Sequence, residues 1–184
     1  MADELELKAV VTDPAALRAR LFSAAGAARM RGRMIDRRYD RGGELAARDE
    51  VLRVRTYQSA DGGTETLLGW KGPARRLPQG YKHREEHELG VSAAPHPILQ
   101  ALGYDVVNTI DREVEVYDVA GATVRVERYP DMDTLLEVEG SPDSIELAIG
   151  ITGIDRDAFT ADSLAEFIRR FEARTGRPAV LARS

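Results

Sequence analysis

Apolar and polar residues alternate along much of residues 3–140, which is the pattern of antiparallel strands with two unlike faces. The first alternating segment spans residues 3–11 and places Glu4, Glu6 and Lys8 on one face, with leucines on the other. Seven more strands are predicted, and several of them are separated by glycine-containing turns. They cover residues 34–40, 51–58, 64–71, 81–89, 109–119, 123–129 and 134–139.

Two helices are predicted between these strands. The first begins at Asp13-Pro14, where a capping side chain precedes a proline, and it ends near Gly26. Its expected apolar stripe consists of Leu17, Leu21 and Phe22. A second, short helix is expected over residues 96–102, closed by Gly103.

Two further helices are predicted after the last strand. Ser141-Pro142-Asp143 opens one of them, and Leu164 begins an apolar i, i+3, i+4, i+7 pattern in the other, which ends at Gly176. About eight antiparallel strands with a few helices predict an α+β fold whose β part is a barrel or a strongly curved sheet. The 184 residues are expected to form a single domain, 1–184.

Composition excludes several classes of function. The net charge is −5, so the chain lacks the overall basic field of a typical nucleic-acid binder, although a local basic cavity remains compatible with it. The absence of cysteine excludes disulfides, thiolate zinc sites and cysteine nucleophiles. The N-terminus shows no signal peptide and no segment is apolar enough to span a membrane, so we expect a cytoplasmic protein without a membrane or nucleic-acid partner.

The predicted strands carry charges at alternate positions, and this has two interpretations. The first is an ordinary solvated sheet face. The second is a closed sheet with these faces turned inward, because arginine and lysine in some strands and paired glutamates in others would form a basic wall opposite an acidic one. Arginine and lysine suit phosphate oxygens, and glutamates suit Mg²⁺ or Mn²⁺. Such a lumen would bind a polyphosphate together with its metal.

The order of these charged segments resembles that of the CYTH superfamily, the triphosphate tunnel metalloenzymes. Glu4-Leu5-Glu6-Leu7-Lys8 resembles its ExExK signature. The later segments that resemble its motifs are Leu52-Arg53-Val54-Arg55, Trp70-Lys71-Gly72-Pro73, Arg84-Glu85-Glu86-His87-Glu88, Arg112 and Leu136-Glu137-Val138-Glu139. Two positions depart from the family pattern: Ile110 replaces the lysine of a KxR motif, and Glu127 stands where an aspartate is usual.

The resemblance implies a closed antiparallel eight-stranded β-barrel, a triphosphate tunnel, with flanking helices. It implies Mg²⁺ or Mn²⁺ as cofactor and tripolyphosphate, thiamine triphosphate or a nucleoside triphosphate as substrate. The implied metal ligands are Glu4, Glu6, Glu86, Glu137 and Glu139. The implied phosphate contacts are Lys8, Arg53, Arg55, Lys71, Arg84 and Arg112, and Lys8 is also the implied catalytic residue that positions or activates the nucleophile.

Several assignments stay open at this point. Glu88, Arg125 and Glu127 face the tunnel or the solvent with about equal odds. The three histidines show no ligand-like pairing, and His83 and His87 are expected to be exposed instead of catalytic. Hydrolysis of a triphosphate is favoured because it demands least of the site. A class IV adenylyl cyclase, which converts ATP to cyclic AMP and pyrophosphate, and a non-catalytic polyphosphate or nucleotide sensor are the alternatives. The protein is expected to be a monomer or a homodimer.

Overall fold

The computed structural model describes the backbone of residues 2–77, 80–93 and 95–183, and the side chains from residue 5 onward within these ranges. The strands are β1 (Ala2–Val10), β2 (Met30–Asp40), β3 (Val51–Ser59), β4 (Thr64–Lys71), β5 (Arg75–Arg76), β6 (Lys82–Gly90), β7 (Asp105–Val119), β8 (Ala122–Arg128) and β9 (Leu135–Glu139). The α-helices are α1 (Pro14–Ala25), α2 (Glu44–Ala47), α3 (His96–Ala101), α4 (Pro142–Thr152) and α5 (Leu164–Thr175).

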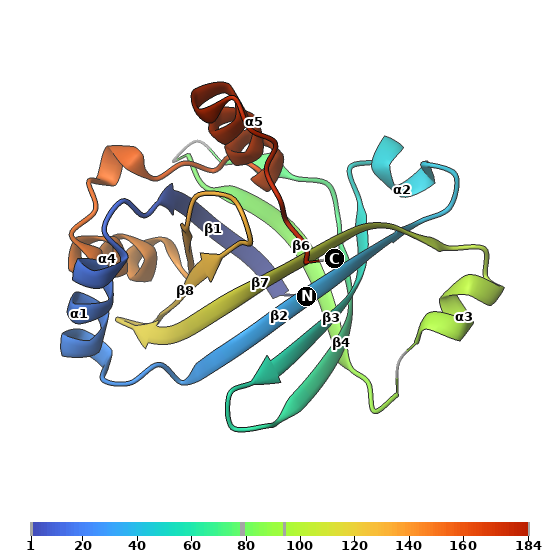
Figure 1. Cartoon of the computed structure of the whole chain (residues 1–184), viewed down its shortest axis with the longest axis horizontal. Helices are drawn as coiled ribbons and strands as arrows, with labels where there is room; N and C mark the ends of the chain where they lie inside the picture. The colour runs from blue at the N-terminus through green and yellow to red at the C-terminus, as the bar shows by residue number, and fades with distance from the viewer. Residues whose placement is uncertain (1, 78–79, 94, 184) are drawn as a thin grey trace.

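Eight of these strands close into an antiparallel barrel. Neighbouring strands follow the order β1-β9-β8-β7-β2-β3-β4-β6, and pairing of β6 with β1 closes the ring. At the closure Glu6 pairs with Lys82 of β6 on one side and with Glu139 of β9 on the other. The two-residue strand β5 lies outside the ring, against β6. The predicted α+β fold with an eight-stranded barrel is therefore confirmed (Figure 1).

The main apolar core lies on the outside of the barrel, beneath helices. Leu7 and Ala9 of β1 and Val138 of β9 are fully buried there, together with Leu21 of α1 and Ile145 of α4. Figure 1 shows α1 and α4 side by side against the part of the barrel formed by β1 and β8. Because the side chains of a strand alternate between its two faces, packing the apolar face under helices turns the charged face into the lumen.

Helix caps fix these covering helices where the sequence predicts them. The Asp13 side chain accepts hydrogen bonds from the backbone N–H groups of Ala15 and Ala16 at the start of α1. Ser141 caps α4 in the same way through the N–H of Ser144. Helix α5 buries Phe167 and Phe171 on its inner face. In the described residues, no helix is long and apolar enough to cross a membrane.

The structure differs from the sequence prediction in a few elements. Strands β2 and β7 begin four residues earlier than expected, since they pair with each other over all of β2, from Met30 to Asp40, and over residues 105–116 of β7. The short helix α2 was not predicted. It forms because Asp40 accepts hydrogen bonds from the N–H groups of Leu45 and Ala46. Phe22 is 60% exposed and does not join the α1 stripe. The single-domain organisation stays a prediction.

We expect Gly32→Ala to destabilise the barrel. Gly32 of β2 pairs with Ser59, and a Cβ atom at this position would lie 2.0 Å from the backbone oxygen of Gln58 in β3. Relieving such an overlap requires the two strands to separate, which should lower the free energy of unfolding by about 1–3 kcal/mol. Urea denaturation of the purified variant measures this.

The matched control is Gly150→Ala on the exposed side of α4, where a Cβ atom would meet nothing within 4 Å. This substitution should raise stability by up to about 1 kcal/mol, because alanine has the higher helix propensity. Equal unfolding free energies for the two variants would contradict the predicted close contact between β2 and β3.

Candidate functional site

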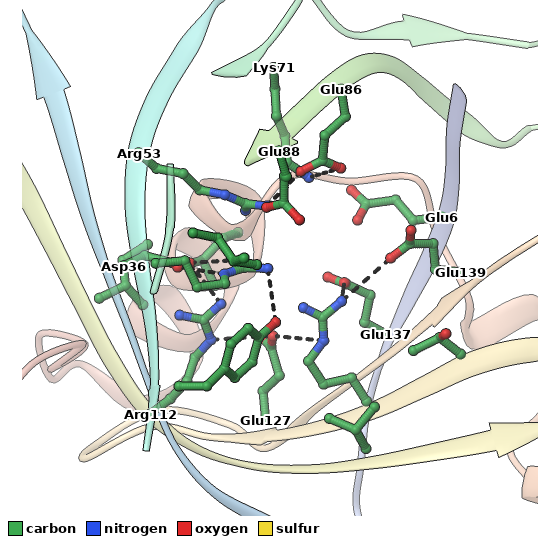
Figure 2. Close-up of a pocket in the computed structure, with 18 of the residues that line it drawn as sticks. Glu6, Asp36, Arg53, Lys71, Glu86, Glu88, Arg112, Glu127, Glu137 and Glu139 are labelled. Carbon is green, nitrogen blue, oxygen red and sulfur yellow. Dashed lines mark hydrogen bonds and ion pairs between the residues drawn. The ribbon is translucent and has the colours of Figure 1, made fainter. Parts of the chain in front are cut away.

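The barrel encloses a cavity of about 840 Å³ whose wall is largely charged. All eight strands of the ring contribute side chains to it, at the alternate positions that face inward (Figure 2). The acidic residues that the ring strands contribute to this wall are Glu6, Asp36, Glu65, Glu86, Glu88, Glu127, Glu137 and Glu139, and Asp49 and Asp61 line it from connections between strands. The basic residues from the same strands are Lys8, Arg38, Arg53, Arg55, Lys71, Lys82, Arg84, Arg112 and Arg125. The charged faces therefore point into a lumen and not into bulk solvent.

Lys8 lies between two buried carboxylates. Its Nζ atom is 2.7 Å from Oε2 of Glu6 and 2.8 Å from Oε2 of Glu137. Lys82 forms a second ion pair with Glu6. Burial alone would raise the pKa of Glu6, but the positive charges of Lys8 and Lys82 outweigh it and lower the pKa to about 2. Glu6 is therefore ionised at neutral pH.

Arg125 extends this network along the wall formed by β8 and β9. Its Nη2 atom is 2.6 Å from Oε1 of Glu137 and 3.5 Å from Oε2 of Glu139. Burial works against ionisation of Glu137, but Arg125 and Lys8 hold its pKa well below the usual range. Glu127 also faces the cavity, where its carboxylate accepts a hydrogen bond from the Tyr129 hydroxyl. Both residues whose orientation the sequence left open on β8 thus line the lumen.

Asp36 organises the opposite wall. Its carboxylate accepts two hydrogen bonds from Arg55, at 2.6 and 2.9 Å, and a third from Arg112 at 3.0 Å. Burial raises the pKa of Asp36, but the charges of Arg55 and Arg112 outweigh it and hold the pKa well below the ordinary value. One carboxylate therefore fixes the direction of two guanidinium groups that the sequence assigned to phosphate.

Arg53 of β3 forms ion pairs with two glutamates of β6, and Gly69 of β4 lies between these two strands. Its Nη2 atom is 2.6 Å from Oε1 of Glu86 and 2.6 Å from Oε1 of Glu88. A Cβ atom at Gly69 would come within 3.3 Å of the Glu88 carboxylate and 3.5 Å of Arg53 Nε. Lys71 is 3.1 Å from the second oxygen of Glu86. Glu88, left open by the sequence, therefore also belongs to the cavity.

Arg84 differs from the other predicted phosphate contacts. Its guanidinium donates to the carboxylate of Asp49 at 2.9 Å and to the carbonyl oxygens of Asp49 and Gly72 at 3.0 and 2.8 Å. It lines the cavity but is anchored to the segments that flank β3 and β4. The side chain of Glu4 lies outside the described part of the structure, although its backbone pairs with that of Arg84.

Several charged residues that line the cavity were not identified from the sequence, among them Asp36 and Arg38 on β2 and Lys82 on β6. The sequence contained a signal for them, because side chains two positions apart on a strand share a face: Asp36 shares one with Arg38, and Lys82 shares one with Arg84. The histidines contribute nothing to the cavity wall in the part of the chain described. His87 contacts Glu85 on the outer face, and His96 contacts the Tyr39 hydroxyl.

The acidic residues have the chemistry of a site for a hard divalent cation. Glu6 and Glu139 are direct partners across β1 and β9, and Glu137 lies two positions from Glu139 on the same inward face. Carboxylate oxygens are the ligands that Mg²⁺ and Mn²⁺ prefer. Among the side chains described, no three acids or histidines already converge on one point, since these carboxylates are turned toward Lys8, Lys82 and Arg125. The chemistry of these donors therefore suits such a metal, and binding it requires the carboxylates to turn from their lysine and arginine partners.

The fold is shared with several solved structures. The PH1819 protein from Pyrococcus horikoshii OT3 matches with a TM-score of 0.72 and 23% identity, over 91% of this chain and 98% of its own. A candidate adenylate cyclase from Vibrio parahaemolyticus matches with a TM-score of 0.76 and 14% identity, over 90% and 97%. HpAC1 from Hippeastrum, a candidate adenylyl cyclase with a dominant triphosphatase activity, matches with a TM-score of 0.63 and 17% identity over both whole chains.

These matches confirm the fold that the resemblance to the CYTH superfamily predicts. Comparisons with protein-family models and with curated proteins gave no match.

The buried carboxylates predict an acid-sensitive fold. The pKa of Glu6 is about 2 in the folded protein, against about 4.3 for glutamate in an unfolded chain. A lowered pKa in the folded state stabilises the fold above the unfolded-state pKa, and this stability is lost as the pH falls toward the folded-state pKa. We therefore expect the free energy of unfolding to decrease between about pH 4.3 and about pH 2.

Urea denaturation at a series of pH values measures this dependence. In Glu6→Gln the decrease should be less steep, because one of the contributing groups no longer titrates. If the unfolding free energy of Glu6→Gln depends on pH as steeply as that of the unchanged protein, the lysine neighbours do not lower the pKa of Glu6.

Proposed function

We propose that this protein is a metal-dependent phosphohydrolase that acts on a triphosphate. One observation carries the proposal: the cavity inside the closed barrel holds buried arginines and the buried Lys8 together with ionised carboxylates. Buried charges in this number are expensive to maintain for stability alone, because hydrophobic replacements of buried ion pairs are often neutral or stabilising. A polyanion together with its divalent cation is the class of ligand that matches both walls.

The basic residues supply the contacts for the phosphate groups. Arg55 and Arg112 approach from one wall, each oriented by Asp36, while Lys8 approaches from the opposite side. Guanidinium groups bind phosphate oxygens through paired, charge-assisted hydrogen bonds. Arg53 and Lys71, both paired with Glu86, complete the set. Phosphoryl transfer requires such neutralisation of charge on the phosphate oxygens together with an aligned nucleophile.

Glu6, Glu137 and Glu139 are the proposed metal ligands, with Glu4 and Glu86 as further candidates. A bound Mg²⁺ or Mn²⁺ would supply neutralisation of phosphate charge and a lowered pKa for bound water. Glu6 and Glu137 are already ionised at neutral pH, so neither must lose a proton before a cation binds.

Lys8 is suited to positioning and charge stabilisation. Burial would lower its pKa, but Glu137 and Glu6 raise the pKa above the usual value. A lysine that stays protonated can donate hydrogen bonds to a phosphate oxygen or to the leaving group, but it cannot accept a proton as a general base. In the proposed reaction water attacks the terminal phosphorus and the bond from this phosphorus to the bridging oxygen breaks. The diphosphate part of the substrate leaves with the bridging oxygen, the attacked phosphorus is released as inorganic phosphate, and the proton of the water passes to solvent.

Hydrolysis is favoured over cyclisation by the activity of one structural neighbour. HpAC1 shares the fold and has a dominant triphosphatase activity although it was considered an adenylyl cyclase. Cyclisation of ATP would require the ribose 3′-hydroxyl to attack the α-phosphorus in the same cavity. A non-catalytic sensor would not need the paired carboxylates on β1 and β9.

We expect the purified protein with Mg²⁺ or Mn²⁺ to release phosphate from tripolyphosphate or from a nucleoside triphosphate. Glu139→Gln should lower kcat by about 100-fold, a loss typical for removal of one electrostatic contact to the transition state. Glu139 is the preferred test position, because its side chain is less buried than that of Glu137 and its substitution leaves Lys8 paired with Glu137. Phosphate release measured with and without a chelator checks this.

The matched control is Glu113→Gln, on the outer face of β7, where Glu113 pairs with the exposed Arg128 and Arg183. Its kcat should equal that of the unchanged protein. If the products formed from ATP are cyclic AMP and pyrophosphate, the proposed hydrolysis is wrong and the reaction is cyclisation. Binding of triphosphates without turnover under any metal condition would favour the sensor.

A further inference from the structure

Arg38 is a cation in the cavity without a counterion. It lies on the inward face of β2, two residues after Asp36, and it pairs with Arg53 of β3 and Asn108 of β7. Its Nε atom is shielded from solvent and has no hydrogen-bond partner. Within the described ranges, its guanidinium makes no ion pair, whereas Arg53, Arg55 and Arg112 each have at least one.

The carboxylate closest to it in sequence is already used by other arginines. Asp36 accepts two hydrogen bonds from Arg55 and one from Arg112, so both of its oxygens are already engaged by other guanidinium groups. The pKa of Arg38 is lowered by burial and, despite attraction to Asp36, by repulsion from Arg53 and Arg112. Positive charge at this place therefore exceeds the negative charge that the protein supplies.

The surrounding wall adds no compensating acid at the matching positions of the neighbouring strand. The β7 residues opposite Arg38 and Asp36 are Asn108 and Ile110, which are uncharged. Ile110 packs with Leu164 in the first turn of α5, and Ser163, Leu164 and Ala165 line the same cavity. The N-terminal end of a helix carries unpaired N–H groups and a partial positive charge, which further favours an anion at this end.

We propose that Arg38 is a further anion-binding residue, which holds a phosphate group of the substrate at the end of the cavity nearest to α5. This inference rests on the proposed function, because it places a triphosphate in the lumen. An unpaired guanidinium is costly in a partly desolvated cavity, and a phosphate removes this cost through charge-assisted hydrogen bonds. Ile110 provides no positive charge on β7. Arg38, on the neighbouring strand β2, would supply a phosphate contact in this part of the cavity.

Arg37 offers a matched control on the same strand. Arg37 and Arg38 are adjacent, but the alternation of β2 turns Arg37 to the outer face, and it does not contribute to the cavity wall. Replacing either arginine by glutamine changes the net charge equally. Only Arg38→Gln removes charge from inside the lumen.

The first experiment measures binding of inorganic tripolyphosphate by calorimetry in a chelator, so that metal-dependent turnover cannot occur. Arg38→Gln should bind about 10- to 100-fold more weakly than the unchanged protein, the usual effect of losing a hydrogen bond between charged groups. Arg38→Lys should retain part of this affinity, and Arg37→Gln should change it less than about twofold. Equal affinities of Arg38→Gln and Arg37→Gln would overturn the inference.

The second experiment separates a ligand-binding role from a structural one. Because Arg38 is surrounded by like charges and has no counterion, Arg38→Gln should keep or raise the Tm of the protein without added anion. The increase in Tm on addition of tripolyphosphate should be smaller in Arg38→Gln than in Arg37→Gln. A lower Tm without anion, together with an unchanged increase on its addition, would assign Arg38 to the fold. Failure of the proposed function would appear separately, as absence of turnover by the unchanged protein.

Discussion

Mutual neutralisation of buried charges is the interaction on which the interior of this barrel depends. An unpaired carboxylate or guanidinium costs several kcal/mol when it leaves water. In the lumen most charges avoid this cost through shared partners: Lys8 serves both Glu6 and Glu137, and Asp36 serves two arginines. The network is therefore balanced locally, pair by pair, although the chain as a whole carries a net charge of −5.

The same constraint explains why the apolar core lies outside the ring. Each strand can present only one face to the lumen, so a charged lumen requires the apolar face to be covered from outside. Leu17 and Leu21 of α1 and Ile149 of α4 provide that cover over β1, β8 and β9. The helices thus stabilise the barrel and, by doing so, fix which side chains point inward. Glycines are used where two backbones or side chains approach closely, as at Gly32 and Gly69.

Sequence alternation predicted the strands and the sharing of faces, but it did not decide which face is inside. That choice came from the resemblance to a known family. The closure of β1 against β6 and the charged side chains that line the enclosed cavity confirm it. Asp36 and Arg38 were missed because Arg37 between them is also charged, which hides the alternation of β2. The partner of Arg84 was unpredictable for a different reason. Asp49 lies 35 residues away in a connection whose path depends on the closed fold.

The paired state of the cavity has a consequence for how a triphosphate and its metal would bind. A phosphate that draws the Arg53 guanidinium away would leave Glu88 without this partner and would leave Glu86 with Lys71. Likewise, a phosphate that draws Lys8 away leaves Glu6 and Glu137 close to each other with less compensation. A divalent cation compensates those carboxylates, so each ligand lowers the cost of binding the other, which is positive coupling. Arg38 is the exception, because it can contact a phosphate without breaking any ion pair in the described structure, and for this reason it is suited to form the first contact with the anion.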